Sequence, residues 1–466
     1  MLTYSFENLR SESLYLHLYK CIKNDILDGK IAAGEKLPSK RSFAKNLGIS
    51  TITVENAYAQ LLAEGYIYSI PKKGYYAADI SERTGFSDTV PMNSENFTIA
   101  ANPVYRFDFV SNRNNAENFP FATWAKLMRE TISEKKEELM VGAPCGGIME
   151  LRMAICRHMK QFRNMDVDPN QVIVGAGTEY LYGLIIQLLG RDKIYAVENP
   201  GYDKIVKIYE SNGVVCRYIP MDKAGILVSE LENSGAQIAH ISPSHHYPTG
   251  IVTPVSRRYE LLGWAAKSEG RYIIEDDYDS EFRLTGKPMA TLQSIDVSEK
   301  VIYMNTFTKS LASTIRISYM VLPHHLLEQF YERMGFYSCT VSNFEQYTLA
   351  RFINDGYFEK HINRMRKYYK SIRDQLMNEL KKDTMEGRIE IREEDAGLHF
   401  LMRLDTDTAD EIFLQRASQN GIRLSSLAGY YFGDPPKKTE HTIIMNYSGI
   451  RAEDIPAAVA CLHNCM

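Results

Sequence analysis

The sequence predicts a two-domain α/β protein, in which a small domain of helices and one β-hairpin precedes a larger domain built on a parallel sheet. Three observations support this prediction. Residues 1–78 have a helical apolar pattern that ends in a short β signal, and residues 79–105 are rich in Ser, Thr and Asn, as linkers are. Over residues 106–466, apolar strand-like runs alternate with amphipathic helical stretches, which predicts a sheet with helices on both faces.

The composition is that of a globular protein with a large core. The chain has 466 residues, of which 44 % are hydrophobic and 24 % charged, and its net charge is −4. Its start is polar, and no uncharged run approaches the roughly 18–20 residues that cross a bilayer, so we expect a cytoplasmic protein without a membrane span. The seven cysteines are scattered without a CxxC pair, which predicts reduced thiols and no metal site.

The N-terminal domain contains two short helices that meet at a glycine. Ser39 can cap the first of them, Gly48 allows the turn, and Ser50 can cap the second. The residues that follow, IYSI and YYAA around PKKG, read as a two-stranded hairpin, so the segment predicts a helix-turn-helix with a wing. An earlier helix ends at Gly29 and carries one apolar stripe, composed of Leu14, Leu18, Cys21, Ile22 and Ile26.

Hydroxyl and basic side chains in this domain suit DNA. Small hydroxyls and free backbone N–H groups at a helix N-terminus can meet phosphates or base edges, and lysine and arginine neutralise phosphate charge. Residues 1–80 hold ten Lys and Arg against eight Asp and Glu, although the whole chain is acidic. The candidate DNA-binding residues are Ser39, Lys40, Arg41, Ser50, Thr51, Thr53, Lys72 and Lys73. A protein-interaction winged helix, or a solvated charged turn at PKKG, remains the alternative.

The segment LPSKRSFAKNLGISTITVENAYAQLLAEGYI resembles the GntR superfamily of bacterial winged-helix repressors over nearly its whole length. The PSxR turn, the helix pair and the AEGYI entry to the wing occur in order at the family's spacing. The resemblance implies that double-stranded promoter or operator DNA is a partner.

In the larger domain, the segment RYIIEDDYDSEF runs from an apolar strand into acidic residues. Side chains alternate along a strand, so Asp276 and Tyr278 point to the same side. A carboxylate can keep a pyridine nitrogen protonated, and a tyrosine can hydrogen-bond the phenolic oxygen of the same ring. Taken alone, the acidic residues of this segment could equally form an acidic loop or a metal site.

The segment VIYMNTFTKSLASTIRISYM favours the cofactor interpretation. Lys309 follows a strand, next to Thr308 and seven residues before Arg316, which suits a Schiff base with an aldehyde cofactor whose phosphate the arginine binds. In GAGTEYL, Gly177 and Thr178 join a turn to a helix whose N-terminus can hold a phosphate. A lone lysine is usually a solvated surface residue, and it is the surrounding pattern that changes this expectation.

Two further strand ends carry aromatic or imidazole side chains. Tyr202 in ENPGY follows a strand and could stack on a cofactor ring, although it could also be a core or loop tyrosine. The turn PSHHYPTG contains His245 and His246, which we expect to be structural and to which we assign no catalytic role.

The segments GAGTEYL, ENPGY, PSHHYPTG, EDDYDSEF and TFTKSL, in that order, resemble fold-type-I aminotransferases. Together with the N-terminal domain, the chain resembles the MocR/GabR subfamily of regulators over essentially its entire length. The resemblance implies bound pyridoxal 5′-phosphate, with Lys309 as the internal-aldimine lysine, Asp276 as the pyridinium partner and Tyr278 as the phenolate partner. It further implies a head-to-tail, domain-swapped homodimer, and it assigns the stacking ring to Tyr202 and the phosphate contacts to Thr178, Thr308 and Arg316.

The sequence departs from this family at the expected effector pocket. In a subfamily member that senses γ-aminobutyrate, two arginines grip the carboxylate of the effector. The matching positions here are Lys204 and Gly429, with Arg423 near the second. Lysine and glycine cannot reproduce bidentate recognition by two arginines, so we expect another effector or another binding mode.

These observations predict a regulator that senses a small amine, an amino acid or pyridoxal phosphate itself through the aldimine at Lys309. The first alternative is an active aminotransferase with an accessory winged-helix domain, and the second is a regulator that has lost the cofactor. The complete helix-turn-helix and the missing arginine clamps favour regulation, with weak or partial transamination at most.

Overall fold

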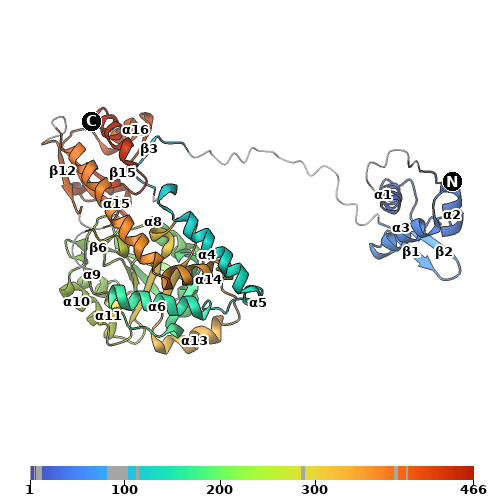
Figure 1. Cartoon of the computed structure of the whole chain (residues 1–466), viewed down its shortest axis with the longest axis horizontal. Coiled ribbons are helices and arrows are strands. Elements are labelled where there is room, and N and C mark those ends of the chain that lie inside the picture. The colour runs from blue at the N-terminus through green and yellow to red at the C-terminus, as the bar shows by residue number, and fades with distance from the viewer. Residues whose placement is uncertain are drawn as a thin grey trace. The chain divides into compact units, whose positions relative to one another are not determined.

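The computed structural model of the chain describes residues 2–4, 6, 13–80, 103–111, 115–284, 289–382, 387–394 and 397–466. The chain divides into two compact units, Met1–Asn102 and Pro103–Met466, which carry the helix-turn-helix and the large α/β domain (Figure 1). Of the predicted linker 79–105, residues 81–102 lie outside the described residues. No helix of the described part combines the length and the apolar character needed to cross a bilayer.

The first unit is a winged helix-turn-helix, as predicted. Its elements are α1 (Leu14–Leu27), α2 (Lys40–Leu47), α3 (Thr51–Ala63), β1 (Ile67–Ile70) and β2 (Gly74–Ala77), and the two strands pair antiparallel. The side chain of Ser39 accepts a hydrogen bond from the Ser42 backbone N–H, and that of Ser50 accepts one from Thr53. Gly48 has a φ of +67°, so the turn uses a left-handed residue that glycine adopts without strain.

The predicted apolar stripe of α1 is wrong at its edges. Leu14 is 41 % exposed, whereas Tyr19 is only 6 % exposed and belongs to the core of the unit. Tyr19 lies three residues before Ile22 and seven before Ile26, so helical spacing places it on the same face as these residues. Its hydroxyl donates a hydrogen bond to Glu64 at the end of α3, 2.5 Å away and 45 residues distant in sequence.

The second unit is built on an eight-stranded sheet. Five adjacent strands are parallel, β11 runs antiparallel to its neighbours β10 and β4, and β7 forms an antiparallel edge on β6. In sheet order the strands are β4 (Val172–Gly175), β11 (Ser318–Val321), β10 (Val301–Thr306), β9 (Tyr272–Asp276), β8 (Ile238–Ile241), β5 (Ile194–Asn199), β6 (Val215–Asp222) and β7 (Gly225–Ile226).

Helices cover both faces of this sheet (Figure 1). Along β10, Ile302 and Met304 pack in one core cluster, while Val301 and Tyr303 pack in clusters on the opposite face, as strand alternation requires. The helices of this part are α4 (Phe121–Glu134), α5 (Lys136–Leu139), α6 (Met149–Arg163), α7 (Thr178–Leu189), α8 (Asp203–Ser211), α9 (Val228–Asn233), α10 (Val255–Ala266), α11 (Leu292–Ile295), α12 (Phe307–Ser310), α13 (His324–Met334) and α14 (Asn343–Asn354).

The C-terminal part of the unit forms a separate layer with its own core. The long helix α15 (Tyr357–Leu380) packs on α14 and on α17 (Ile455–His463). The strands β12 (Ile389–Arg392), β13 (His399–Leu404), β16 (Thr442–Asn446) and β15 (Ser425–Ser426) form a four-stranded sheet beside α16 (Asp410–Gln419). A parallel pair joins β14 (Ile422–Arg423) to β3 (Phe107–Asp108), which ties this layer to the start of the unit.

Candidate functional site

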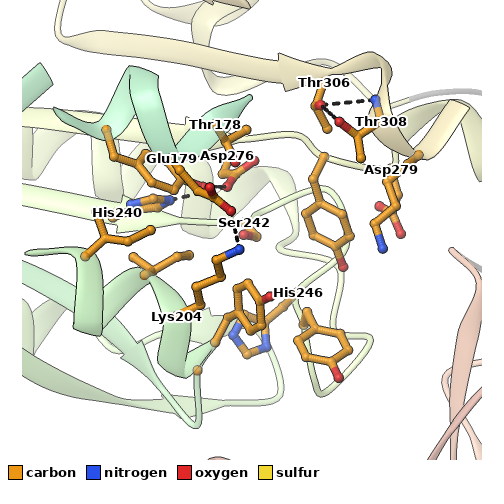
Figure 2. A pocket seen from close by; sticks show the side chains of 18 of the residues that line it. Thr178, Glu179, Lys204, His240, Ser242, His246, Asp276, Asp279, Thr306 and Thr308 are labelled. Carbon is orange, nitrogen blue, oxygen red and sulfur yellow. Dashed lines mark hydrogen bonds and ion pairs between the residues drawn. The ribbon is translucent and has the colours of Figure 1, made fainter. Parts of the chain in front are cut away.

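A cavity of about 290 Å³ opens where several strands of the large sheet end. Its wall draws on residues that follow β4, β5, β8, β9 and β10, which lie far apart in sequence. Ligands of open α/β sheets gather at such strand ends, because loops and helix N-termini converge there. The structure brings together in this cavity Thr178, Tyr202, Lys204, Asp276, Tyr278, Thr308, Lys309 and Arg316. Figure 2 labels four of them, Thr178, Lys204, Asp276 and Thr308.

Asp276 presents a buried carboxylate to the cavity. Its Oδ2 accepts a hydrogen bond from the Tyr182 hydroxyl at 2.6 Å and lies 3.5 Å from His240 Nε2. Burial beside this carboxylate raises the pKa of Tyr182 well above its ordinary value, so the phenol keeps its proton. Asp276 Oδ1 is also buried and has no hydrogen-bond partner among the described residues. An unpaired buried carboxylate oxygen is costly, and an N–H donor of a ligand would satisfy it.

The end of the cavity at the N-terminus of α7 is suited to an anion. Thr178 is the first residue of α7, whose N-terminus offers free backbone N–H groups, and the Thr306 hydroxyl donates to Thr308 Oγ1 at 2.8 Å. Arg316 lies against Gly177, where an added Cβ would come within 2.3 Å of the arginine Nη2. Gly177 therefore leaves room for the guanidinium, although it does not itself line the cavity.

Glu179 is a feature of this end that the sequence did not predict. Its carboxylate lies 3.3 Å from Arg316 Nη2 and also forms an ion pair with Lys204, which reaches across the cavity to it (Figure 2). The Lys204 side chain is 51 % exposed and that of Glu179 42 % exposed, so solvent weakens the pair. The Glu179 carboxylate thus contacts both Arg316, the expected phosphate-binding residue, and Lys204, the expected effector-binding residue.

Lys309 follows β10, in the short helix α12. Burial lowers the pKa of its ammonium to about 8, although the Asp279 carboxylate opposes the shift. The ammonium lies 5.8 Å from the centre of the Tyr278 ring. Burial, followed by the charge of Asp279, raises the pKa of Tyr278 well above its ordinary value, so its hydroxyl remains a donor.

Not all of the predicted aromatic and effector-binding residues line the cavity. Tyr202 lines the cavity, is 45 % exposed and packs edge-on against Tyr247. Lys204 lines the cavity, but Gly429 lies in a short 3-10 helix, Leu427–Tyr430, outside the lining residues. Arg423 is also outside, where it lies 3.5 Å from Asp108. In this chain, therefore, only one of the two expected effector positions reaches the cavity.

Sequence reasoning missed a cluster of buried groups beside these residues. Glu198 lines the cavity and accepts a hydrogen bond from the Ser242 N–H, while burial raises the pKa of its carboxyl to about 8. His246 Nε2 lies 3.5 Å from Glu198 Oε2, and burial lowers the pKa of this histidine to about 3. The motif PSHHYPTG was the available signal. The sequence contains no motif that marks His399, on β13, as a site residue, because it is a single histidine within an apolar strand.

The acidic residues around Asp276 do not form one cluster. Asp277 forms a buried ion pair with Arg163 and accepts from the Tyr303 hydroxyl, while Glu275 accepts from the backbone N–H groups of residues 292 and 293. Strand alternation sends neighbouring carboxylates to different partners, and this leaves Asp276 for the cavity.

The winged helix places its candidate DNA-binding residues on the surface. Ser39, Arg41, Ser50 and Thr51 are exposed around the N-termini of α2 and α3, and Thr53 is partly buried. Lys72 and Lys73 are exposed at the turn between the two wing strands, where Lys72 has a φ of +62°. Lys40 differs, because its ammonium lies 2.6 Å from Glu55 and part of its charge is balanced within the protein.

Comparisons with known proteins agree with both units. The family described as aminotransferase class I and II matches residues 107–438, and the bacterial regulatory proteins of the gntR family match residues 14–76. The HTH-type transcriptional regulator YdeL of Bacillus subtilis (strain 168) is 36 % identical over 442 residues, which cover 95 % of this chain and 94 % of YdeL. MocR of Rhizobium meliloti, named a probable rhizopine catabolism regulatory protein, is 30 % identical and covers 94 % of this chain and 90 % of its own length.

Among solved structures, the multiple substrate aminotransferase of Thermococcus profundus is similar to the large unit. The TM-score is 0.68 at 23 % sequence identity, and the match covers 79 % of this chain and 92 % of that one. At this identity the likeness shows the fold alone.

Proposed function

This chain belongs to the MocR/GabR subfamily of GntR-type transcription regulators, and we propose that it senses an amine through a cofactor attached to Lys309. Its winged helix belongs to a DNA-binding family, and its large unit to a fold family that depends on pyridoxal phosphate. The residues that hold the cofactor, the effector and the DNA are our assignments. We also propose a cytoplasmic location, where a bacterial regulator meets the chromosome.

The cavity fits pyridoxal 5′-phosphate, and the observation that carries this assignment is the unpaired, buried Asp276 Oδ1. A protonated ring nitrogen would satisfy that oxygen and would offset the charge of the carboxylate. Lys309 and Tyr278 lie in the same cavity, so we assign the aldehyde carbon to Lys309 and the phenolic oxygen to Tyr278. Tyr202, on the wall, is our candidate for stacking on the ring.

The phosphate is assigned to the anion-binding end of the cavity. Thr178 and the N-terminus of α7 offer backbone and hydroxyl donors, Thr308 offers a hydroxyl, and Arg316 offers a guanidinium. Gly177 contributes by its lack of a side chain, because a Cβ would displace Arg316.

When bound, the cofactor supplies an aldehyde carbon that can exchange one amine for another. The Lys309 amine holds this carbon, and its lowered pKa leaves a useful fraction of neutral amine near pH 7. An effector amine that displaces Lys309 can shift the protein from one conformational state to another only if it interacts differently with the two states. We propose that these states belong to a domain-swapped homodimer, and cross-linking of the full chain with mass determination tests its existence.

Sodium borohydride reduction tests the cofactor assignment. Reduction of the protein loaded with pyridoxal 5′-phosphate should fix the cofactor to one peptide, which contains Lys309. Lys309→Ala should abolish the label, whereas Lys300→Ala is the matched control, because Lys300 donates to the Glu269 backbone carbonyl on the surface and should leave the label in place. No label in the wild-type chain, or a label that persists in Lys309→Ala, would contradict the assignment.

The effector is proposed to be an amine or amino acid other than γ-aminobutyrate, or the cofactor itself. Lys204 is paired with Glu179 and Gly429 lies outside the cavity, so these two positions do not offer two arginine-like contacts to a carboxylate. Titration of the loaded protein with candidate amines, followed by visible absorbance, tests this proposal. A shift of the band at low γ-aminobutyrate concentration would contradict it, and steady-state transamination at ordinary enzymatic rates would favour the aminotransferase alternative.

A further inference from the structure

A histidine, a carboxylate and a phenol meet at the wall of the cavity. His245 follows β8 and is 4 % exposed, and Asp279 follows β9 and is 5 % exposed. His245 Nδ1 lies 2.8 Å from Asp279 Oδ2 and 3.3 Å from Tyr278 Oη. Tyr278 and Asp279 line the cavity, whereas His245 is not among its lining residues. The histidine can therefore act on a ligand through its neighbours and not by direct contact.

The His245 ring is held on its other sides by packing. A Cβ added to Gly397 would lie 1.9 Å from His245 Cε1, so the main chain approaches the ring as closely as glycine allows. The His399 ring also packs on His245, with the two ring centres 4.5 Å apart. These contacts keep Nδ1 directed at Asp279 and Tyr278.

The carboxylate determines which ring nitrogen carries the proton. An aspartate carboxylate accepts hydrogen bonds, so His245 Nδ1 donates to Asp279 Oδ2, and the same N–H is within hydrogen-bond distance of Tyr278 Oη. Tyr278 therefore accepts at His245 and cannot donate its proton there. His245 Nε2 is buried without a hydrogen-bond partner among the described residues, so no second contact competes for the orientation of the ring.

We infer that His245, oriented by Asp279, is a positioning residue that turns the Tyr278 hydroxyl proton into the cavity, toward the phenolic oxygen of the cofactor. This inference rests on the proposed attachment of the cofactor at Lys309. A hydrogen bond from Tyr278 withdraws negative charge from the phenolic oxygen. That charge favours a proton on the lysine-linked nitrogen, so the hydrogen bond lowers the pH at which this proton is lost.

Loss of the His245 N–H should therefore raise the pH midpoint of the visible absorbance change of the loaded protein. The groups that face the Tyr278–His245 pair are Asp279, Asp276, Glu198, Tyr247, His399 and Lys309. All six are unchanged in the variants below, but Asp279 loses a hydrogen-bond donor when His245 is replaced. A midpoint shift that Asp279 alone causes would persist without the Tyr278 hydroxyl, so the double variant separates it from an effect through Tyr278.

The experiment is a pH titration of the loaded full chain and of six variants. His245→Phe keeps a ring but has no N–H, and His245→Ala removes the ring without risk of overpacking. His245→Asn keeps an N–H near the position of Nδ1. Tyr278→Phe removes the hydroxyl, alone and combined with His245→Phe. His158→Gln is the control, because His158 stacks on Phe162 and packs edge-on against Phe358, outside the cavity.

We expect His245→Phe and His245→Ala to raise the midpoint by roughly half to one pH unit, as the loss of one neutral hydrogen bond implies. The midpoint of His245→Asn should lie close to that of the wild type, and His158→Gln should not change the midpoint. The double variant should have the same midpoint as Tyr278→Phe alone. A His245→Phe shift that persists at full size without the Tyr278 hydroxyl, or no shift in either His245 variant, would overturn the inference.

The same titration separates this inference from the proposed function. A wild-type chain that gains no visible band with pyridoxal 5′-phosphate would refute the attachment at Lys309 and, with it, the role of His245. A wild-type chain that takes up the cofactor and titrates with the same midpoint as the His245 variants would refute the role of His245 alone.

Discussion

Lys309 should capture pyridoxal 5′-phosphate with the pH dependence of an amine whose pKa is about 8. Burial lowers this pKa from its ordinary value, and the Asp279 carboxylate limits the shift. Only the neutral amine attacks an aldehyde, so the neutral fraction controls the rate of capture. At pH 7 that fraction is about 9 % for a pKa near 8 and about 0.03 % for an ordinary lysine, a difference of about 300-fold.

The rate should rise about tenfold per pH unit below pH 8 and level off above it, because the amine is then mostly neutral. Mixing the protein without cofactor with pyridoxal 5′-phosphate between pH 6 and 10 and following the visible band measures this dependence. Nα-acetyl-lysine treated in parallel corrects for ionisation of the aldehyde itself. Asp279→Asn should move the point of levelling to lower pH, because the carboxylate that favours the ammonium is gone.

A rate that continues to rise tenfold per unit through pH 9.5 would refute the reasoning, because Lys309 would then be an ordinary, solvated amine. A levelling point that does not move in Asp279→Asn would show that burial acts alone. Lys309→Ala serves as the blank for capture by other lysines.

Three further predictions concern the two units separately. Lys72→Gln combined with Lys73→Gln should weaken binding to every DNA sequence and reduce the slope of log affinity against log salt by about 2, measured by fluorescence anisotropy. Lys30→Gln is the control, because Lys30 is already paired with Asp25 and Asp28. Ser50→Ala should destabilise the winged helix by about 1 kcal/mol and Ser50→Gly by a few tenths, measured by denaturant unfolding; equal losses would argue against the cap. Asp276→Asn should weaken cofactor binding about 10- to 100-fold in equilibrium dialysis, because a charged hydrogen bond to the ring nitrogen is lost; unchanged affinity would contradict the assignment.

The winged helix was predictable from sequence because local interactions determine it. Ser39, Gly48 and Ser50 act on residues within three or four positions of themselves, so caps and turn could be read directly. The hydrogen-bond partner of Tyr19 could not, because Glu64 lies at the end of another helix. Local chemistry located the helix ends, whereas contacts between helices join residues far apart in sequence.

In the large unit, the residues at strand ends were predictable and their supporting contacts were not. Lys309, Asp276 and Thr178 each follow a recognisable strand or begin a helix, so topology alone brings them to one edge of the sheet. Strand alternation points Asp276 into the cavity and Asp277 away from it, toward Arg163. Arg163, which binds Asp277, lies 114 residues away in sequence, so this contact could not be predicted. His245 and Asp279 similarly meet only after β8 and β9 pair.

Glu179 gives a physical reason, independent of Gly429, for the change of effector that we propose. Its carboxylate contacts both Arg316, to which we assign the phosphate, and Lys204, to which we assign the effector. A phosphate at Arg316 competes with Glu179, and a carboxylate at Lys204 competes with the same group. Because Lys204 is the neighbouring cation, a Glu179 carboxylate displaced by phosphate would remain paired with it. The loaded cavity would then present to an effector the neutral Glu179–Lys204 ion pair, where a γ-aminobutyrate sensor presents a free arginine. This difference weakens the binding of an effector carboxylate and least affects an amine that has no carboxylate.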